Sequence, residues 1–437
     1  MAGSLCLDVR AGKSVSAKER PTPLVICDAC KIILIPPHGT NRSDLELLTI
    51  QQKIKKSSTP GPLIEQLGWL FVSKARSGND AGYYNLVEQT ALCLEAQQPE
   101  SSGALLLRGH SLQSMHKFKE AEPIARKLVE KRGASFDYGL LGDILIDRGQ
   151  MLEGIEAYQK MIELRPDLHS YTRAAHARWL KGDVEGAEEL ISMATSAGSS
   201  RDAEATAWSY TRRAAYELQL GHLSESLRAA NVALQLQPDY AAALFFKGRI
   251  QIAQGQTNDA IASLTHAVKL TRLPEYQWLI SDLLNLSGKK SEAGAVELEL
   301  SKHGAQEDPR TLALYLATRR TNSEVAVKLA ERELTQRADI FTHDALAWAL
   351  HSAGKFTEAR EQSKLALREG TEDARLFFHA AVIAQSDKDP KAALAYSKRA
   401  TAIQQMLFPS EQKQLAELNG RVVGAQSQAK IKTSESK

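Results

Sequence analysis

The sequence lacks an excess of charge of either sign. Its 437 residues include 55 Lys plus Arg and 52 Asp plus Glu, which gives a formal net charge of +3. Proteins that bind nucleic acids or anionic membranes usually carry a clear basic excess or a concentrated basic patch. The balanced charge therefore predicts that neither nucleic acid nor a membrane surface is the partner of this protein.

Long apolar runs are also missing. No stretch approaches the roughly 20 residues that a membrane-spanning helix needs, so the sequence predicts no transmembrane segment. The first residues include Arg10, Lys13, Lys18 and Arg20 without the apolar core of a secretory signal. We therefore expect a cytoplasmic protein, and a periplasmic or envelope-associated one if an export signal precedes this start.

Cysteine is scarce as well. The four cysteines are Cys6, Cys27, Cys30 and Cys93. They are too few to stabilise a chain of this length by disulfide bonds, so we expect no disulfide framework. Cys27 and Cys30 form a C-x-x-C pair, but a structural zinc site needs four ligands and no second pair exists. Residues 31–37 are typical of a short strand broken by prolines, so we interpret the pair as incidental thiols.

What the sequence does contain is an internal repeat with a near-constant period. A small or apolar residue recurs in steps of 33 or 34 residues, with one step of 39 that includes the loop-like stretch 196–200. The residues of this series are Gly109, Gly142, Ala175, Ala214, Gly248, Ser281, Leu314, Ala347 and Ala381.

Two further series keep the same step and indicate a helical hairpin in each period. Glycines suited to the turn between two helices are Gly149, Gly182, Gly221, Gly255, Gly288 and Gly354. Small residues suited to a close helix contact early in the second helix are Ala121, Gly154, Ala187, Ser226, Ala260, Ala293, Ala326, Ala359 and Ala393. Each period thus predicts two antiparallel helices.

This pattern resembles the tetratricopeptide repeat family, whose period is about 34 residues with two antiparallel helices per repeat. The resemblance covers residues 62–404 and is strongest over 136–166, 241–272 and 341–370. It implies an all-α fold, a right-handed α-solenoid or superhelix of about ten helix-turn-helix hairpins. Pentatricopeptide arrays have a similar period and bind RNA, but the balanced charge and the hairpin signature favour the tetratricopeptide form.

The repeat divides the chain into four parts. Residues 1–61 are rich in proline and predict an irregular, partly disordered leader with one short helix over 44–55. The array occupies 62–404, and 405–419 is expected to form a capping helix for its end. Residues 420–437 are rich in Ser, Gln and Lys and predict a disordered tail.

Motifs of catalysis and of metal or phosphate binding are not found. His169 and His176 are seven residues apart and His343 and His351 are eight apart, so neither pair suits one metal ion on a helix. The sequence has no phosphate-binding loop, no H-E-x-x-H and no nucleophile elbow. We therefore predict a protein that is not an enzyme and that has no cofactor or metal.

The resemblance implies that the first helix of each hairpin lines a concave groove. Positions three before and one after the residue of the first series then face a partner, and in the C-terminal half they carry large aromatic and charged side chains. Such residues dominate binding hot spots. The predicted partner-binding residues are Phe245, Arg249, Trp278, Asp282, Asp344, Trp348 and Phe378.

The function that follows is a non-enzymatic scaffold or adaptor that binds a peptide or helix of another protein in this groove. The stretch 344–351, followed by Gly354, is similar to the bacterial multi-repeat type of these proteins. One alternative is therefore an assembly subunit of a bacterial envelope complex. Another is an enzyme with a hydrolase or transferase site in the leader or at a repeat junction.

Overall fold

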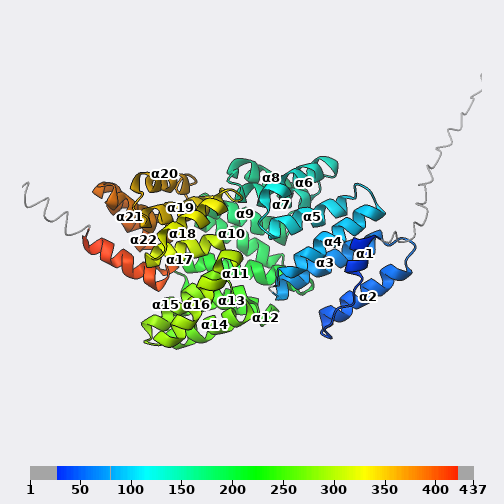
Figure 1. Ribbon diagram of the computed structural model, residues 1–437, viewed down its shortest axis with the longest axis horizontal. Coiled ribbons are helices and arrows are strands. Elements are labelled where there is room, and N and C mark those ends of the chain that lie inside the picture. Colours follow the sequence, from blue (N-terminus) through cyan, green and yellow to red (C-terminus); the bar gives the residue numbers. More distant parts are fainter. Residues whose placement is uncertain (1–26, 79, 422–437) are drawn as a thin grey trace, which may run out of the picture.

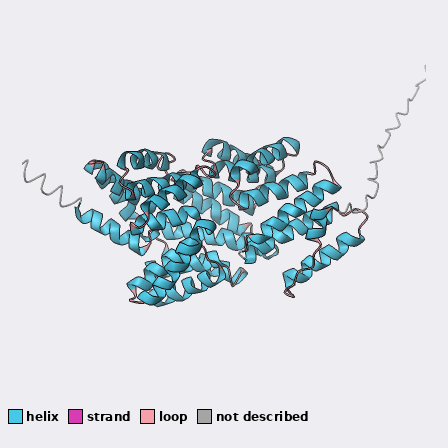
Figure 2. Ribbon diagram, in the orientation of Figure 1, coloured by secondary structure: helices cyan, strands magenta, loops and turns pink. Residues whose placement is uncertain are grey.

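The structure of the protein is a computed structural model that describes residues 27–78 and 80–421. These residues form α-helices, two short 3-10 helices and loops, and no strand occurs in them (Figure 2). From Gly61 onward the helices pack as consecutive pairs along an elongated array (Figure 1). The predicted all-α solenoid of about ten helical hairpins is confirmed.

The ten hairpins follow one another without interruption. Their helices are α3 (Gly61–Gly78) with α4 (Gly82–Gln97), α5 (Ser102–Ser114) with α6 (Phe118–Lys131), α7 (Ser135–Asp147) with α8 (Met151–Leu164), α9 (Leu168–Leu180) with α10 (Val184–Ser196), α11 (Ala203–Gln219) with α12 (Leu223–Leu236), α13 (Ala241–Ala253) with α14 (Thr257–Leu270), α15 (Pro274–Leu286) with α16 (Lys290–Glu307), α17 (Pro309–Arg319) with α18 (Ser323–Leu334), α19 (Ile340–Ser352) with α20 (Phe356–Ala366), and α21 (Ala374–Ser386) with α22 (Pro390–Ala402).

The hairpin of α7 and α8 shows why the repeat keeps its glycines. Gly149 ends α7 with a φ of +74°, a conformation that glycine adopts without steric cost, and its N–H donates to the Ile146 carbonyl. Gly142 lies where the helices cross, against the ring of Tyr158 and near the backbone of Gly154. Small residues at the crossing therefore allow the two backbones to approach closely.

The hairpin of α17 and α18 departs from the pattern and reaches the same shape by other means. Where six hairpins have a turn glycine, Arg320 and Asn322 adopt left-handed backbone conformations, with φ of 54° and 50°. Such conformations are uncommon for residues other than glycine. The long step of 39 residues is taken up elsewhere, by the 3-10 helix η1 (Ser200–Asp202) and the longer α11.

Two predictions for the N-terminal part need correction. Residues 28–33 form the helix α1 (Asp28–Ile33), not a strand, and α2 (Arg42–Lys56) is longer than the helix expected at 44–55. Both helices pack against the first hairpin through a buried cluster that includes Ile33, Ile50 and Ile54. The leader is therefore ordered from Cys27 onward, because its apolar residues cover the open end of the array.

The N-terminal half of the array contacts the C-terminal half directly. A buried cluster joins Ile146 of α7 and Leu180 of α9 to Ile340 of α19 and Leu376 of α21. The rings of Trp179 and Phe341 stack across this contact, with centroids 5.8 Å apart. The solenoid thus closes on itself, whereas a simple open array makes contacts between neighbouring repeats alone.

Polar contacts cross the same closure. The Thr371 hydroxyl donates to the carbonyl of Leu180, and Lys181 lies 3.1 Å from Glu369. The Arg337 guanidinium lies 3.0 Å from the Asp147 carboxylate and also covers the ring of Phe118. Backbone and side-chain polar groups of the two halves are therefore paired across the contact.

Candidate functional site

The predicted groove contains the C-terminal end of the described chain. After α22, residues 403–421 form a loop with the 3-10 helix η2 (Gln404–Met406) and then a helix over 409–421, red in Figure 1. We call residues 403–421 the C-terminal segment. It lies against the first helices of three hairpins, α11, α13 and α15, which were expected to face a partner.

Aromatic side chains form the centre of this contact. Phe408 of the C-terminal segment packs edge-on against Trp278 and Phe245, with ring centroids 5.1 and 6.4 Å away. All three side chains are almost completely buried. Edge-to-face pairs of this kind contribute beyond the apolar area that they bury. Phe408 therefore contacts two of the aromatic residues that the sequence predicted to bind a partner.

The charged groove residues bind the backbone of the same segment. The Arg249 guanidinium donates to the Met406 carbonyl at 2.6 Å. The Asp282 carboxylate accepts the backbone N–H of Ser410 at 2.9 Å, and the Trp278 indole N–H points to the Ser410 hydroxyl at 3.4 Å. Hydrogen bonds to charged groups are stronger than neutral ones, so these contacts fix the position of the segment.

A buried ion pair completes the contact. Arg375 of α21 donates to both carboxylate oxygens of Glu411, at 2.6 and 3.2 Å, and Glu411 is fully buried. The same carboxylate accepts the N–H of Phe408 at 2.8 Å, and the guanidinium lies over the rings of Trp278 and Phe408. Because a buried charge is costly unless it is paired, Glu411 and Arg375 depend on each other.

Burial raises the pKa of Asp282 above its ordinary value, and its hydrogen bonds to Ser410 and the charge of Arg319 oppose that rise. Arg319 lies 2.7 Å from the other Asp282 oxygen. The carboxylate is thus held between a cation of the array and the C-terminal segment. Its partners make it an acceptor for a peptide N–H rather than a proton donor.

The remaining predicted site residues make their hydrogen bonds and ring contacts to helices of the array. Asp344 accepts from His379 at 2.8 Å, and His379 stacks on Trp348 with centroids 4.1 Å apart. The Trp348 indole donates to the Thr318 hydroxyl at 2.9 Å, and Phe378 is fully buried. The structure therefore places Asp344, Trp348 and Phe378 in the packing between α17, α19 and α21.

The structure also brings together a cavity that the sequence analysis did not anticipate. It has a volume of about 380 Å³ and lies where the two halves of the array meet. Three arginines, two aspartates and a histidine from distant repeats contribute to its wall: Arg310, Arg337, Arg368, Asp147, Asp339 and His176. No single repeat contains enough of these residues to form a recognisable motif, so local spacing gave no signal.

The charges in this cavity are largely paired with each other. Arg310 lies 3.0 Å from Asp339, and Arg337 lies 3.0 Å from Asp147. Burial raises the pKa of Asp147 to about 6, against the opposing charge of Arg337. Burial, with the charge of Arg212, lowers the pKa of His176 to about 3. The cavity is polar, but its cations are already neutralised by carboxylates.

Across residues 27–78 and 80–421, no helix has the length and apolar character needed to cross a membrane. This agrees with the lack of long apolar runs in the sequence.

Comparison with known proteins identifies the repeat. Two family models described as tetratricopeptide repeat match the chain, over residues 211–271 and 138–168. The human IFIT1 dimer with m7Gppp-AAAA has 16% sequence identity and a TM-score of 0.51, and the match covers 75% of this chain and 77% of that chain. A monomeric IFIT1 mutant with Gppp-AAAA matches at 16% identity and a TM-score of 0.50, over 75% and 76% of the two chains. A chain of the APC/C hetero-tetramer Cut9-Hcn1 matches at 14% identity and a TM-score of 0.38, over 88% and 96%. The IFIT1 likenesses show the fold.

Proposed function

Because this chain is a tetratricopeptide repeat protein, we propose that it is a non-enzymatic scaffold whose groove binds a peptide segment of a partner protein. Arrays of this family are generally protein-interaction scaffolds, and the two matches to the repeat support the same general role. The groove of α11, α13 and α15 is the proposed site, with Phe245, Arg249, Trp278 and Asp282 as its contact residues.

The observation that carries this proposal is the way the groove holds the chain's own C-terminal segment. Phe408 enters an aromatic pocket, the Met406 carbonyl accepts from a cation, and the N–H of Ser410 donates to a carboxylate. These are the contacts by which peptides are bound to protein grooves. We infer that a partner segment with an aromatic anchor, followed by a helix with an early acidic residue, replaces residues 403–421.

The charge distribution favours a protein over an RNA partner. The IFIT1 structures contain capped RNA, but Arg310 and Arg337 of the cavity in this chain lie beside Asp339 and Asp147, and Arg368 lies 3.1 Å from Glu369. Binding to phosphates requires cations that are free to replace counterions. The experiment below therefore compares binding of the peptide with binding of an RNA ligand.

A labelled synthetic peptide of residues 403–421 tests the groove directly. We expect it to bind weakly to the parent chain, because the tethered segment competes at high effective concentration. Phe408→Ala in the full chain should loosen that segment and tighten peptide binding by about tenfold or more, because the aromatic anchor is a hot-spot contact. Fluorescence anisotropy measures both affinities.

Matched controls identify the site of binding. Adding Arg249→Leu to the Phe408→Ala chain should abolish peptide binding, whereas Leu286→Ala, at an exposed side chain on α15, should not affect it. A peptide in which Phe408 is alanine should not bind. Equal binding to the parent and to Phe408→Ala, or tighter binding of a capped oligoadenylate than of the peptide, would contradict the proposal.

A further inference from the structure

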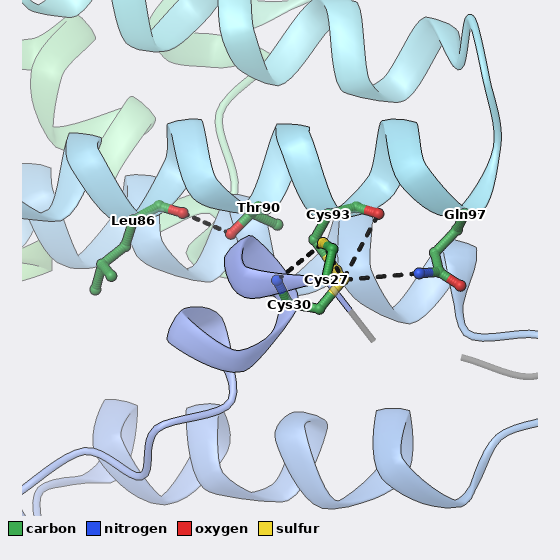
Figure 3. Close-up of a disulfide and its surroundings, with 6 residues drawn as sticks. All are labelled: Cys27, Cys30, Leu86, Thr90, Cys93 and Gln97. Atoms are coloured by element: carbon green, nitrogen blue, oxygen red, sulfur yellow. Dashed lines mark hydrogen bonds between the residues drawn. A yellow bond between two sulfur atoms is a disulfide. The ribbon is translucent and has the colours of Figure 1, made fainter. Parts of the chain in front are cut away.

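Three cysteines meet where α1 joins the array. Cys30 and Cys93 form a disulfide, and the thiol of Cys27 lies 3.1 Å from the sulfur of Cys30 (Figure 3). The C-x-x-C pair was interpreted as two incidental thiols, and the structure corrects this for Cys30, which is bonded to Cys93. The signal was missed because Cys93 lies 63 residues beyond Cys30, on a different element.

The disulfide fastens α1 to α4, the second helix of the first hairpin. Gln51 of α2 assists by donating from its side-chain amide to the carbonyls of Ile33 and Ile35, at 2.8 and 2.9 Å. Between this leader and the first hairpin is a cavity of about 420 Å³, lined in part by Lys74 and Tyr83. The disulfide therefore closes one side of a cavity-containing junction.

Accessibility differs sharply among the three sulfurs. Cys30 and Cys93 are 0% exposed, whereas Cys27 is partly exposed. A thiol in solution must contact a disulfide sulfur to exchange with it, and rates depend on that access. The Cys30–Cys93 bond is thus shielded from solution reductants but lies beside the sulfur of Cys27.

Hydrogen bonds position the sulfurs of this cluster. The backbone N–H of Cys30 donates to the Cys27 sulfur at 3.3 Å, which holds that sulfur beside the disulfide. The side-chain amide of Gln97 donates to the Cys30 sulfur at 3.6 Å. The nearby charges of α1, Asp28 and Lys31, pair with each other at the surface.

We propose that Cys27, Cys30 and Cys93 form a thiol–disulfide exchange site in which Cys27 opens the buried disulfide and presents it to a soluble dithiol. The Cys27 thiolate forms a bond to the Cys30 sulfur, and the Cys30–Cys93 bond breaks. Its electron pair stays on Cys93, which takes up the proton that Cys27 released. This step is an isomerisation and needs no external oxidant or reductant.

The second step involves the solution partner. A dithiol attacks the more accessible Cys27–Cys30 disulfide through a mixed disulfide, which reduces both cysteines to thiols and oxidises the dithiol to its own disulfide. A disulfide-containing oxidant reverses these steps. Once Cys93 is released, α1 is held to α4 without a covalent bond, so the junction over the cavity loosens.

The kinetics of reduction test this role. In a Cys6→Ser background, which leaves the cluster cysteines as the sole thiols, the native full chain is mixed with dithiothreitol, quenched with acid and alkylated. Peptide mass spectrometry then measures the loss of the Cys30–Cys93 bond. We expect Cys27→Ser to slow this loss about tenfold or more, because the internal nucleophile is gone.

Two further variants test whether the effect comes from the Cys27 thiol itself. Ala29→Ser makes a similar polar change in α1 without removing a thiol and should be reduced at the parent rate. Cys93→Ser, oxidised with diamide, should form the Cys27–Cys30 disulfide. The proposal is overturned if Cys27→Ser is reduced as fast as the parent, if Cys27–Cys30 never forms, or if the purified chain holds one zinc ion on three reduced thiols.

Discussion

At the scale of single residues, packing is close where the two helices of a hairpin cross. A Cβ atom at Gly142 would overlap ring carbons of Tyr158 and would come within 3.1 Å of the Gly154 carbonyl oxygen. Tyr158 cannot move freely, because its hydroxyl donates to Asp143 at 2.8 Å. The glycine is therefore required by contact between neighbouring helices and not by its own backbone conformation.

We expect Gly142→Ala to destabilise the protein by about 1–3 kcal/mol, although alanine favours helix, because overpacking a core contact outweighs helix propensity. The matched change Gly294→Ala lies on α16, where no atom lies within 4 Å of the new Cβ. It should stabilise the protein by about 0.5–1 kcal/mol, because alanine favours helix over glycine. Urea unfolding of the two variants measures the difference, and the same sign for both would refute this explanation.

His176 predicts a dependence of stability on pH. Burial lowers its pKa to about 3 in the folded chain, whereas an unfolded histidine has a pKa near 6.5. Between these values the unfolded state binds more protons, so stability is lost as the pH falls below about 6.5. In His176→Gln this loss should be smaller, as measured by urea midpoints at pH 7.0 and 4.5. The exposed His266→Gln is the control, and identical profiles for both variants would disprove the assignment.

The buried tryptophans change how the groove has to be tested. Trp278 and Trp348 are two of the predicted partner-binding residues, so their replacement by alanine is the simplest test of the groove. Both side chains are buried among helices, and a buried tryptophan replaced by alanine costs about 3–5 kcal/mol. Arg249 is the better position for a binding variant, because its side chain remains partly exposed.

At the scale of elements, the C-terminal segment is the one that joins several hairpins. Its Gln405 side chain donates to the carbonyls of Leu218 and Gln219, at 3.2 and 2.9 Å, and Gln414 donates to the carbonyl of Thr318 at 3.0 Å. The sequence predicted a capping helix at 405–419 for the end of the array. In the structure the helix begins at residue 409 and extends to 421, and the C-terminal segment that contains it lies along α11, α13 and α15.

Glu411→Ala should release this segment selectively. It leaves Arg375, whose side chain is 21% exposed, without its partner, so the cost should fall below the roughly 3–5 kcal/mol of a fully buried pair. Hydrogen exchange followed by mass spectrometry should show faster exchange in residues 403–421 and unchanged exchange in α5–α8. Glu361→Ala removes an exposed ion pair on α20 and should leave both regions unchanged. Uniformly faster exchange along the chain would argue against a separately held segment.

At the scale of the whole molecule, the array behaves as a closed unit because its halves contact each other. We expect Phe341→Ala with Thr371→Ala to weaken the closure, since one removes the stack on Trp179 and the other a hydrogen bond to Leu180. The radius of gyration from small-angle X-ray scattering should rise, and stability should fall by about 2–4 kcal/mol. Phe356→Ala, at an exposed ring, is the control, and an unchanged radius in the double variant would contradict the closure.

The sequence by itself determined the repeat, because every hairpin is specified by residues within about 34 positions of one another. Small residues at Gly142 and Gly154 and a turn glycine at Gly149 serve local geometry, so the pattern is visible in one dimension. Helical periodicity also predicted a set of groove residues, and their role in binding a partner stays a prediction. The set is Phe245, Arg249, Trp278, Asp282, Asp344, Trp348 and Phe378.

Tertiary structure alone decided what those faces meet. The curvature of a solenoid is the sum of small rotations at every interface between repeats, so the contact of Trp179 with Phe341 is not encoded in any one repeat. For the same reason the sequence did not show that Phe408 fills the groove or that Cys93 reaches Cys30. These pairings join residues from 63 to more than 160 positions apart, where no periodic pattern extends.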